Sequence, residues 1–254
     1  MKVLFIGDIV GRSGRQALAE YLPRLAEKFS WDFCIANGEN AAGGKGLTLN
    51  VAEELLALGI DCLTMGNHTW DNKEIFQFID DAQYIVRPAN YPIPTPGKGY
   101  TIIPSKQGRL GVVSLSGQTF MGPYNCPFAA AEEVLPLLSD CDGIIVDVHA
   151  EATSEKVALG RYLDGRVSAV LGTHTHIQTA DEKILPRGTL YITDVGMCGA
   201  ADSILGMEVK PVLTKFTTKL PGRFSAARGP GMVNAVYLDL AEKTIQRINQ
   251  LPAP

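Results

Sequence analysis

Short apolar runs alternate with longer segments of helical periodicity over the first third of the chain. Strands are expected over 2–7, 32–37 and 60–65, where the apolar runs are short and end at Gly or polar residues. Helices are expected over 15–29 and 49–58, where apolar residues recur every three or four positions. Thr48 stands in front of the second helix as a candidate N-cap. The pattern therefore predicts β-α-β-α-β.

The same alternation continues through the rest of the chain. Further strands are expected over 100–103, 110–115, 143–148, 168–171, 190–193 and 232–240, and 241–251 is expected to close a sheet edge. Helices are expected over 128–138 and 154–163, and the Pro- and Gly-rich segment 91–99 is expected to be a loop. No repeat, low-complexity tract or linker divides the chain. We therefore predict one α/β domain over residues 1–254.

Polar residues follow the predicted strands at the points where they end. Asp8 follows the first strand, Glu39 and Asn40 follow the second, and Asn67 follows the third. The chain has four histidines, and all of them come after predicted strands: His68, His149, His174 and His176. In α/β sheets, ligands bind outside the carboxyl ends of the strands. These side chains are therefore expected to form one site.

The side chains of this expected site are typical metal ligands. His174 and His176 form a His-x-His pair, and in an extended segment both side chains would point the same way. Imidazole, carboxylate and carboxamide without thiolate suit Fe, Mn or Zn. Two such metals about 3.5–4 Å apart can hold a hydroxide between them and clamp a phosphoryl group. The leaving oxygen still needs a proton, which His68, next to Asn67, could supply as a general acid.

Composition narrows the classes of partner. The net charge is -4, and a non-specific nucleic-acid binder normally carries a basic surface, so no stable nucleic-acid partner is expected. A nucleotide substrate stays compatible because bound metals supply positive charge. The five cysteines contain no CxxC pair and are expected to be reduced thiols. No apolar run approaches the roughly 20 residues of a membrane span, so a soluble, cytoplasmic protein is expected.

The motifs of other nucleotide-binding or hydrolytic sites are incomplete or absent in this sequence. The Gly-Gly-Lys-Gly stretch within 38–46 fails the P-loop spacing, since Glu39 and Gly46 stand where Gly and Ser or Thr are required. A loop over the site is expected there, with Lys45 near substrate phosphate. No dinucleotide-binding GxGxxG and no GxSxG elbow is present. Asp71, three residues after His68, is expected either to orient that imidazole or to cap a helix.

The order of these motifs resembles the calcineurin-like metallophosphoesterases. The order is Gly-Asp, a bridging acid, Gly-Asn-His, a lone His and then His-x-His. More narrowly, the chain is similar to the YmdB family of bacterial metallophosphoesterases, described as cyclic-nucleotide phosphodiesterases. The matching segments are 5–15, 36–48, 65–72, 147–156, 172–181 and 193–200.

The resemblance implies a four-layer α-β-β-α sandwich with metals at the sheet ends. It implies these roles: Asp8 and His176 on one metal, Asn67, His149 and His174 on the other, Glu39 bridging, and His68 as proton donor. The wider superfamily has a His where Val10 stands here, and Asn40 is expected to replace that ligand. The usual bridging Asp is also a Glu in this chain. Iron is expected first and manganese second, on family similarity.

The leading hypothesis is a dinuclear phosphodiesterase that hydrolyses small cyclic nucleotides, linked 2′,3′ or 3′,5′. One alternative keeps the site and changes the substrate, giving a phosphomonoesterase or an RNA-directed nuclease. Another is a metal-binding regulatory or scaffold protein with little activity. The physiological substrate and the oligomeric state, including a homo-oligomer, are left open by the residues.

Overall fold

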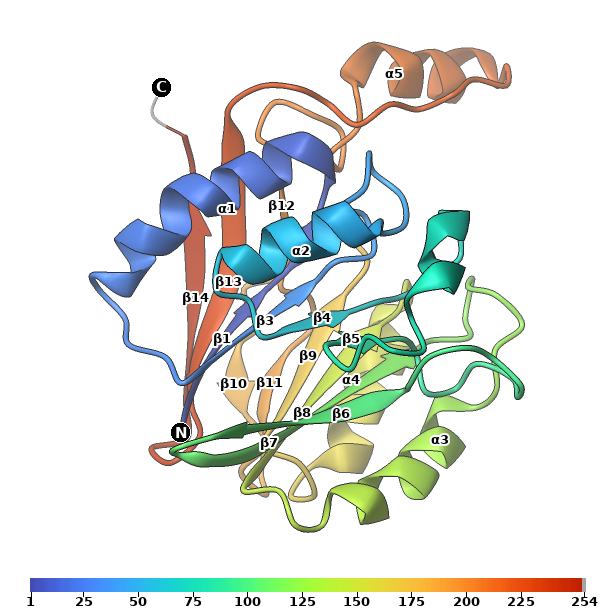
Figure 1. Ribbon diagram of the computed structural model, residues 1–254. Coiled ribbons are helices and arrows are strands. Elements are labelled where there is room, and N and C mark those ends of the chain that lie inside the picture. Colours follow the sequence, from blue (N-terminus) through green and yellow to red (C-terminus); the bar gives the residue numbers. More distant parts are fainter. Residues whose placement is uncertain (253–254) are drawn as a thin grey trace.

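The computed structural model describes residues 1–252, in which two β-sheets lie face to face between two layers of helices (Figure 1). Helices α1 (Gly11–Ala26) and α2 (Leu49–Ala57) cover the outer face of the first sheet. Helices α3 (Pro127–Val134) and α4 (Thr153–Leu163) cover the second sheet. The predicted α-β-β-α sandwich is therefore confirmed.

The first sheet runs in the order β2-β12-β13-β1-β3-β4-β5, with β14 paired to β13. Its strands are β1 (Lys2–Ile6), β2 (Asp8–Ile9), β3 (Phe33–Asn37), β4 (Cys62–Thr64), β5 (Ile85–Val86), β12 (Met197–Ala200), β13 (Gly231–Asp239) and β14 (Thr244–Gln250). Strands β1, β3, β4 and β5 are parallel neighbours. Their carboxyl ends therefore share one edge of the sheet.

The second sheet runs in the order β10-β11-β9-β8-β7-β6. Its strands are β6 (Tyr100–Ser105), β7 (Gly108–Ser116), β8 (Gly143–His149), β9 (Ala169–Thr173), β10 (Lys183–Ile184) and β11 (Leu190–Ile192). Strands β7, β8, β9 and β11 are parallel, and an antiparallel strand closes each edge.

Apolar side chains of both sheets interlock between the layers. Phe5 and Ile35 from the first sheet and Ile145 and Leu171 from the second belong to one buried cluster. These side chains come from near-continuous apolar strands, as expected where both faces of a parallel sheet are covered. The packing brings the carboxyl ends of β3 and β8 together, since Asn37 Nδ2 donates to Asp147 Oδ2 over 3.1 Å.

Several predicted elements differ in extent. The segment 128–138, predicted as one helix, contains two elements, because α3 ends at Val134 and the 3₁₀-helix η2 (Leu135–Leu138) follows. Pro136 lacks the N–H that would continue the α-helical ladder. Thr48 caps α2 as expected, since its hydroxyl accepts from Val51 N over 3.3 Å.

Helix α5 (Val209–Thr218), strand β12 and the 3₁₀-helix η1 (Lys73–Gln77) had no counterpart in the predicted elements. In α5 only Val212 is buried, so its apolar residues do not mark a core-facing stripe. None of the helices over residues 1–252 combines the length and hydropathy of a membrane span.

Candidate metal centre

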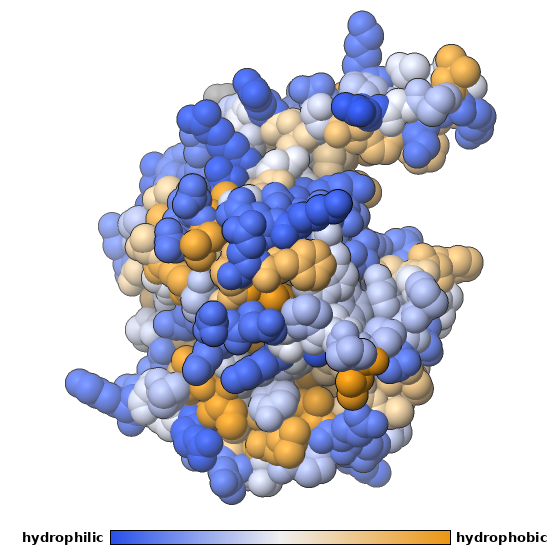
Figure 2. Space-filling view, turned by 45° about the vertical axis from the view of Figure 1, so that its right-hand side comes forward, coloured by the Kyte–Doolittle hydropathy of each residue, from blue (hydrophilic) through white to orange (hydrophobic). Residues whose placement is uncertain are grey.

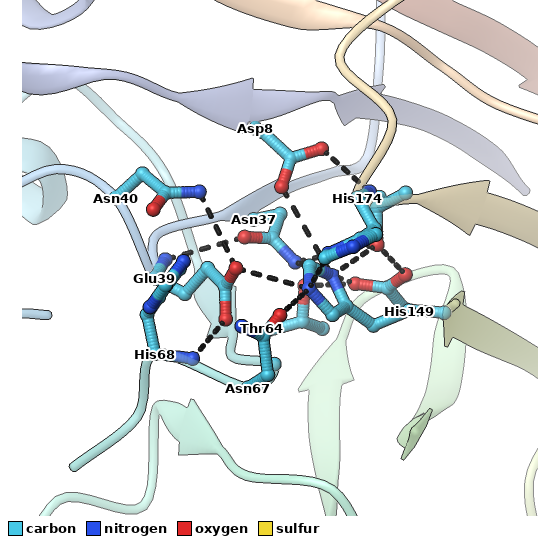
Figure 3. Close-up of polar contacts among 12 residues, drawn as sticks. Asp8, Asn37, Glu39, Asn40, Thr64, Asn67, His68, His149 and His174 are labelled. Atoms are coloured by element: carbon cyan, nitrogen blue, oxygen red, sulfur yellow. Dashed lines mark hydrogen bonds and ion pairs between the residues drawn. The ribbon is translucent and has the colours of Figure 1, made fainter. Parts of the chain in front are cut away.

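The structure brings all eight predicted site residues to the shared edge of the two sheets, and Figure 3 labels all of them except His176. Asp8 begins β2, Glu39 and Asn40 lie in the turn after β3, Asn67 and His68 follow β4, His149 ends β8, and His174 and His176 lie in the loop after β9. Each ligand-type side chain thus sits where a buried strand gives way to a turn.

Four potential ligand atoms converge around His149, on one side of the centre. Its Nε2 lies 2.9 Å from Glu39 Oε1, 2.9 Å from Asn67 Oδ1 and 3.0 Å from His174 Nδ1. Glu39, His149 and His174 offer atoms that all lie within 4.8 Å of one another. Ligand atoms brought this close together from four different segments form an arrangement that suits a transition-metal ion.

Asp8 lies at the other side of the centre and lacks a full set of partners. Its Oδ2 accepts from His174 N over 3.1 Å, whereas the fully buried Oδ1 has no hydrogen-bond partner within residues 1–252. The nearest basic nitrogens to Oδ1 are His176 Nε2 at 3.7 Å and His149 Nδ1 at 4.0 Å. A buried oxygen without a partner is costly, and a bound cation would satisfy it.

Asn40 lies beside Asp8, where it is expected to replace the ligand missing at Val10. Its Nδ2 lies 3.3 Å from Glu39 Oε1 and 3.3 Å from His176 Nε2. The side chain therefore reaches the site, but it presents the amide nitrogen. Binding a metal through Oδ1 requires the amide to turn over.

Hydrogen bonds to two histidines orient their rings. The Thr173 hydroxyl donates to Asp147 Oδ1 over 2.7 Å and so receives the Nδ1–H of His149 at 2.9 Å. His176 donates its Nδ1–H to the carbonyl oxygen of Leu205 over 3.0 Å. In the neutral form of each ring the lone pair therefore lies on Nε2, which faces the site. Such outer hydrogen bonds fix the tautomer that a metal-binding imidazole needs.

A buried polar network behind His149 was not anticipated from the sequence. Asp147 is fully buried and accepts from Thr64 Oγ1 at 2.6 Å and Asn37 Nδ2 at 3.1 Å, besides Thr173. A signal was present for Asp147, which stands two residues before the predicted ligand His149 inside an otherwise apolar strand. Residues two apart on a strand face the same side, so a polar residue at this position supports the ligand that follows.

His68 lies at the rim of the centre. Its backbone N–H donates to Glu39 Oε2 over 2.8 Å, and its Nδ1 lies 2.9 Å from Asp71 Oδ2. Asp71 thus orients the imidazole, and the capping role falls to Asn72, which accepts from Glu74 N at the start of η1. Lys45 Nζ lies 3.7 Å from the same Asp71 oxygen.

The expectation that His174 and His176 occupy an extended segment is wrong. Their φ angles are 98° and 66°, in the region that side chains rarely adopt, so the pair does not point one way. His174 turns toward His149, and His176 turns toward Asp8. Asp194 holds the loop by accepting from the N–H and hydroxyl of Thr175 over 3.0 and 2.7 Å.

The charged groups of the centre strongly shift one another's pKa values. Burial raises the pKa of Asp8 to about 6. Burial alone would lower the pKa of His149, but the Glu39 and Asp8 carboxylates raise it to about 9. The same ion pair holds the pKa of Glu39 well below its usual range despite burial. Burial and the neighbouring His149 cation lower the pKa of His174 to about 3. Without a metal, a proton on His149 is therefore the cation of the site.

The centre opens into a cavity of about 360 Å³. Polar residues form its floor, namely Glu39, Asn40, His68, Glu151, His174, Thr175 and His176. Apolar residues form its wall, namely Ile204, Leu205, Met207, Val212, Phe216 and Phe224. The apolar and helical periodicity of the sequence predicted no element over this wall segment. A polar floor with an apolar wall suits a ligand that combines an anionic group with a flat apolar one.

Two packed sheets with side chains of metal-ligand type at their common edge are the arrangement expected of a metallophosphoesterase. The solved structure of the NAD nucleotidase NadN of Haemophilus influenzae superposes with a TM-score of 0.58 at 13% identity, covering 98% of this chain and 55% of that one. At that identity the likeness shows the fold, and it confirms the predicted fold class.

The chain belongs to the YmdB-like family, whose sequence model matches residues 4–251. It is 52% identical over 245 residues to a 2′,3′-cyclic-nucleotide 2′-phosphodiesterase of Bacillus subtilis (strain 168), covering 96% of this chain and 93% of the relative. The crystal structure of a novel phosphatase of Mycoplasma pneumoniae matches with a TM-score of 0.92 at 34% identity, covering 99% and 93% of the two chains. The predicted family is confirmed, and the chain is a phosphoric ester hydrolase.

Proposed function

We propose that this protein hydrolyses small cyclic nucleotides, 2′,3′-cyclic nucleotides above all, at a centre of two metal ions. The observation that carries the proposal is the convergence of three ligand atoms within 3.0 Å of His149 Nε2, beside Asp8 Oδ1, which has no hydrogen-bond partner among residues 1–252. One ion would be held by Asp8, Asn40 and His176, the other by Asn67, His149 and His174, and both by Glu39.

Two cations bound there supply a nucleophile from water at neutral pH and neutralise charge on the phosphoryl oxygens. The residues of the chain prepare the site for them. His149 and His176 present Nε2 because Thr173 and Leu205 hold the opposite ring nitrogens. Iron is proposed first and manganese second, on the family resemblance.

His68 is proposed as the residue that gives a proton to the leaving ribose oxygen. It lines the cavity and stands outside the cluster of ligand atoms around His149. Asp71 receives its Nδ1–H at 2.9 Å, which leaves Nε2 as the nitrogen that can deliver a proton. A positioned imidazole of this kind typically contributes about 10²–10⁴-fold to a rate.

The substrate class follows from the relatives and from the shape of the cavity. The Bacillus subtilis relative is named for 2′,3′-cyclic nucleotides and for its action at the 2′ position. The cavity of about 360 Å³ joins the acidic and imidazole floor to an apolar wall, which fits a phosphate next to a nucleoside. Adding water across the bond between phosphorus and O2′ frees the 2′-hydroxyl and leaves a 3′-monophosphate.

Metal analysis of protein purified without oxygen, paired with assays on four phosphate esters, tests the proposal. The substrates are adenosine 2′,3′-cyclic phosphate, adenosine 3′,5′-cyclic phosphate, adenosine 3′-monophosphate and an aryl phosphodiester. About two ions per chain are expected, with turnover fastest on the 2′,3′-cyclic phosphate, and chelator-treated protein is the control. Absence of turnover with Fe, Mn, Zn and Co would favour the scaffold alternative. Turnover of the monoester alone would favour a phosphomonoesterase.

A further inference from the structure

A basic arm overhangs the metal centre. We use this name for residues 209–228, which comprise α5 and the segment that returns from it toward β13 (Figure 1). The arm contains five basic residues and no acidic ones: Lys210, Lys215, Lys219, Arg223 and Arg228. The chain as a whole has 23 basic and 27 acidic residues, so the remainder carries a net charge of −9. The charge of this protein is therefore strongly segregated.

The cations of the arm are free to meet an external anion. All five basic side chains are exposed, and none forms an ion pair with any residue between 1 and 252. Lys215 Nζ lies 5.0 Å from the ring centroid of Phe224, and Lys219 Nζ lies 5.9 Å from that of Phe216. The arm thus interleaves lysines with exposed aromatic rings.

The base of the arm is fixed to the body of the protein. Met207 and Ala226 form a β-bridge, Glu208 N donates to Ser225 O over 3.0 Å, and Ala227 N donates to Gly206 O over 2.7 Å. The Ser13 hydroxyl of α1 donates to Ala227 O over 3.0 Å. The arm is therefore a positioned overhang with a defined relation to the site.

The apolar side of the arm faces the metal centre. Val212, Phe216 and Phe224 line the same cavity as His174 and His176. Figure 2 shows the arm standing over a hollow in the surface, with hydrophobic residues mostly on the side toward the hollow and hydrophilic ones mostly on the outer side. The carbonyl of Leu205, just before the arm, also accepts the Nδ1–H of His176. The arm and the metal centre therefore form one continuous surface.

We infer that the basic arm binds single-stranded RNA, whose 3′-terminal 2′,3′-cyclic phosphate then lies in the metal centre. The inference rests on the proposed function and extends it from free nucleotides to RNA ends. Proteins that bind single strands combine a positive surface for the backbone with aromatic rings on which bases stack, and the arm has both. A lone cyclic nucleotide could occupy the cavity, but its single phosphate would leave the cations of the arm without a partner.

Charge complementarity and the position of the arm favour RNA over a membrane surface as its ligand. A basic amphipathic helix also suits anionic lipid. Here, however, both exposed rings of the arm, Phe216 and Phe224, line the proposed catalytic cavity, so the ligand of the arm and the substrate must meet there. RNA meets this condition because its 2′-hydroxyl allows a cyclic phosphate to end a polyanionic chain. The net charge of the whole chain conceals this surface, since the −9 of the remainder offsets the arm.

Comparing two substrates that share one reacting group tests the inference. The pair is adenosine 2′,3′-cyclic phosphate and a decaribonucleotide that ends in the same cyclic phosphate. For the wild type, kcat/KM on the oligonucleotide should exceed that on the mononucleotide by about tenfold or more, since each stacked base contributes about that much. The triple variant K210Q/K215Q/K219Q should lose this advantage and keep mononucleotide turnover within twofold.

Salt and matched variants sharpen the test. The slope of log affinity against log salt for the decaribonucleotide 3′-phosphate should become shallower by about 2 in the triple variant, since each single-strand phosphate contact contributes about 0.7. The control K28Q/K106Q/K243Q removes three exposed lysines elsewhere and should behave as the wild type. Phe224→Leu keeps an apolar side chain without a ring and should lower kcat/KM on the oligonucleotide about fivefold.

Three results would overturn the inference. They are equal kcat/KM on both substrates in the wild type, equal losses in the arm and control variants, and binding to phosphatidylglycerol vesicles with no affinity for the oligonucleotide. Failure of the proposed function looks different, because the wild type would then turn over neither cyclic phosphate. In that event, the salt slopes for oligonucleotide binding still decide whether the arm recognises RNA.

Discussion

The two halves of the metal centre are built differently. Around His149, four ligand atoms already lie in contact, and the ring is held from behind by the buried network of Thr173 and Asp147. Around Asp8, one carboxylate oxygen has no partner within residues 1–252, and Asn40 offers an amide nitrogen. The His149 half is therefore preorganised, whereas the Asp8 half depends on a cation to complete it.

The difference follows from the elements that carry the ligands. His149 ends a strand of the second sheet, and its ring meets residues from turns after β4 and β9. Its proton, with a pKa of about 9, forms an ion pair with Glu39 that satisfies both buried groups. Asp8 has no such pairing, so its buried carboxylate stores an unfavourable energy that a metal would release. We therefore expect the Asp8 half to lower the stability of the metal-free protein more than the His149 half does, and to gain more from a bound cation.

Removing the group shared by both halves should have the largest effect. Glu39→Gln removes the carboxylate that contacts both His149 and Asn40, so both ions should be lost and turnover of the 2′,3′-cyclic phosphate should fall about ten-thousandfold or more. Metal content and initial rates measure this, with the exposed Glu53→Gln as control. If Glu39→Gln retained two ions and activity, Glu39 would not be the group that joins the two halves of the centre.

Removing the proposed acid should separate catalysis from metal binding. His68→Ala should keep both ions while turnover falls about a hundred- to a thousandfold, because proton delivery is lost and the ligands remain. Asp71→Asn, which disturbs the same imidazole at 2.9 Å, should lower the rate less. Loss of the metals, or an unchanged rate in His68→Ala, would contradict the assigned role.

Metal binding should depend on pH through the His149 half. The pKa of metal-free His149 is raised to about 9, so a metal has to displace a proton at neutral pH. Apparent affinity should therefore rise by up to about tenfold per pH unit between pH 7 and 9, and level off above. In metal-free protein, the stability from this raised pKa is fully present below the ordinary imidazole value and is lost as pH rises through about 9. Competition with a chelating dye measures the affinity, and a flat profile would show that His149 is not the cationic group.

Neutralising Asp8 should stabilise the metal-free protein. Burial raises the pKa of Asp8 to about 6, so its contribution is favourable while it is protonated and is lost as pH rises through that value. At pH 8, Asp8→Asn should therefore raise the free energy of unfolding of metal-free protein by roughly 2 kcal/mol. Denaturant unfolding with and without chelator measures it. The variant should also gain less stability from added metal. A metal-free variant less stable than the metal-free wild type would show that the buried Asp8 carboxylate is not unfavourable.

Loosening the support behind His149 should have the smallest effect. Thr173→Val removes the hydroxyl that receives the His149 Nδ1–H, and outer-shell changes of this kind typically cost about tenfold or more in metal affinity. Because Asp147 loses a donor as well, some stability should also be lost. Titration with a metal-chelator buffer measures the affinity, and Thr244→Val, at an exposed position of β14, is the control. Equal affinities in the two variants would show that the network is only structural.

Periodicity and residue type along the chain predicted most of the strands and helices and the side chains expected to gather at the sheet edge, whereas the four-layer arrangement was implied by the family resemblance. Buried strands appear as short apolar runs, and their polar ends mark the sheet edge because parallel strands share it. The family and the fold class are confirmed. The assignment of individual ligands and of His68 stays a prediction, although the structure brings these side chains together.

Tertiary structure alone decided which atoms meet and how the charge is distributed. Packing between segments far apart in the sequence determines the support of His149 by Asp147 and Thr173 and the different neighbours of His174 and His176. It also leaves Asp8 Oδ1 without a hydrogen-bond partner in the part of the chain that the structure describes, 1–252. The basic arm is a further case, because a net charge of −4 carries no information about where charges lie. Local pattern reflects the preferences of neighbouring residues, whereas a site is made by contacts that only the folded chain creates.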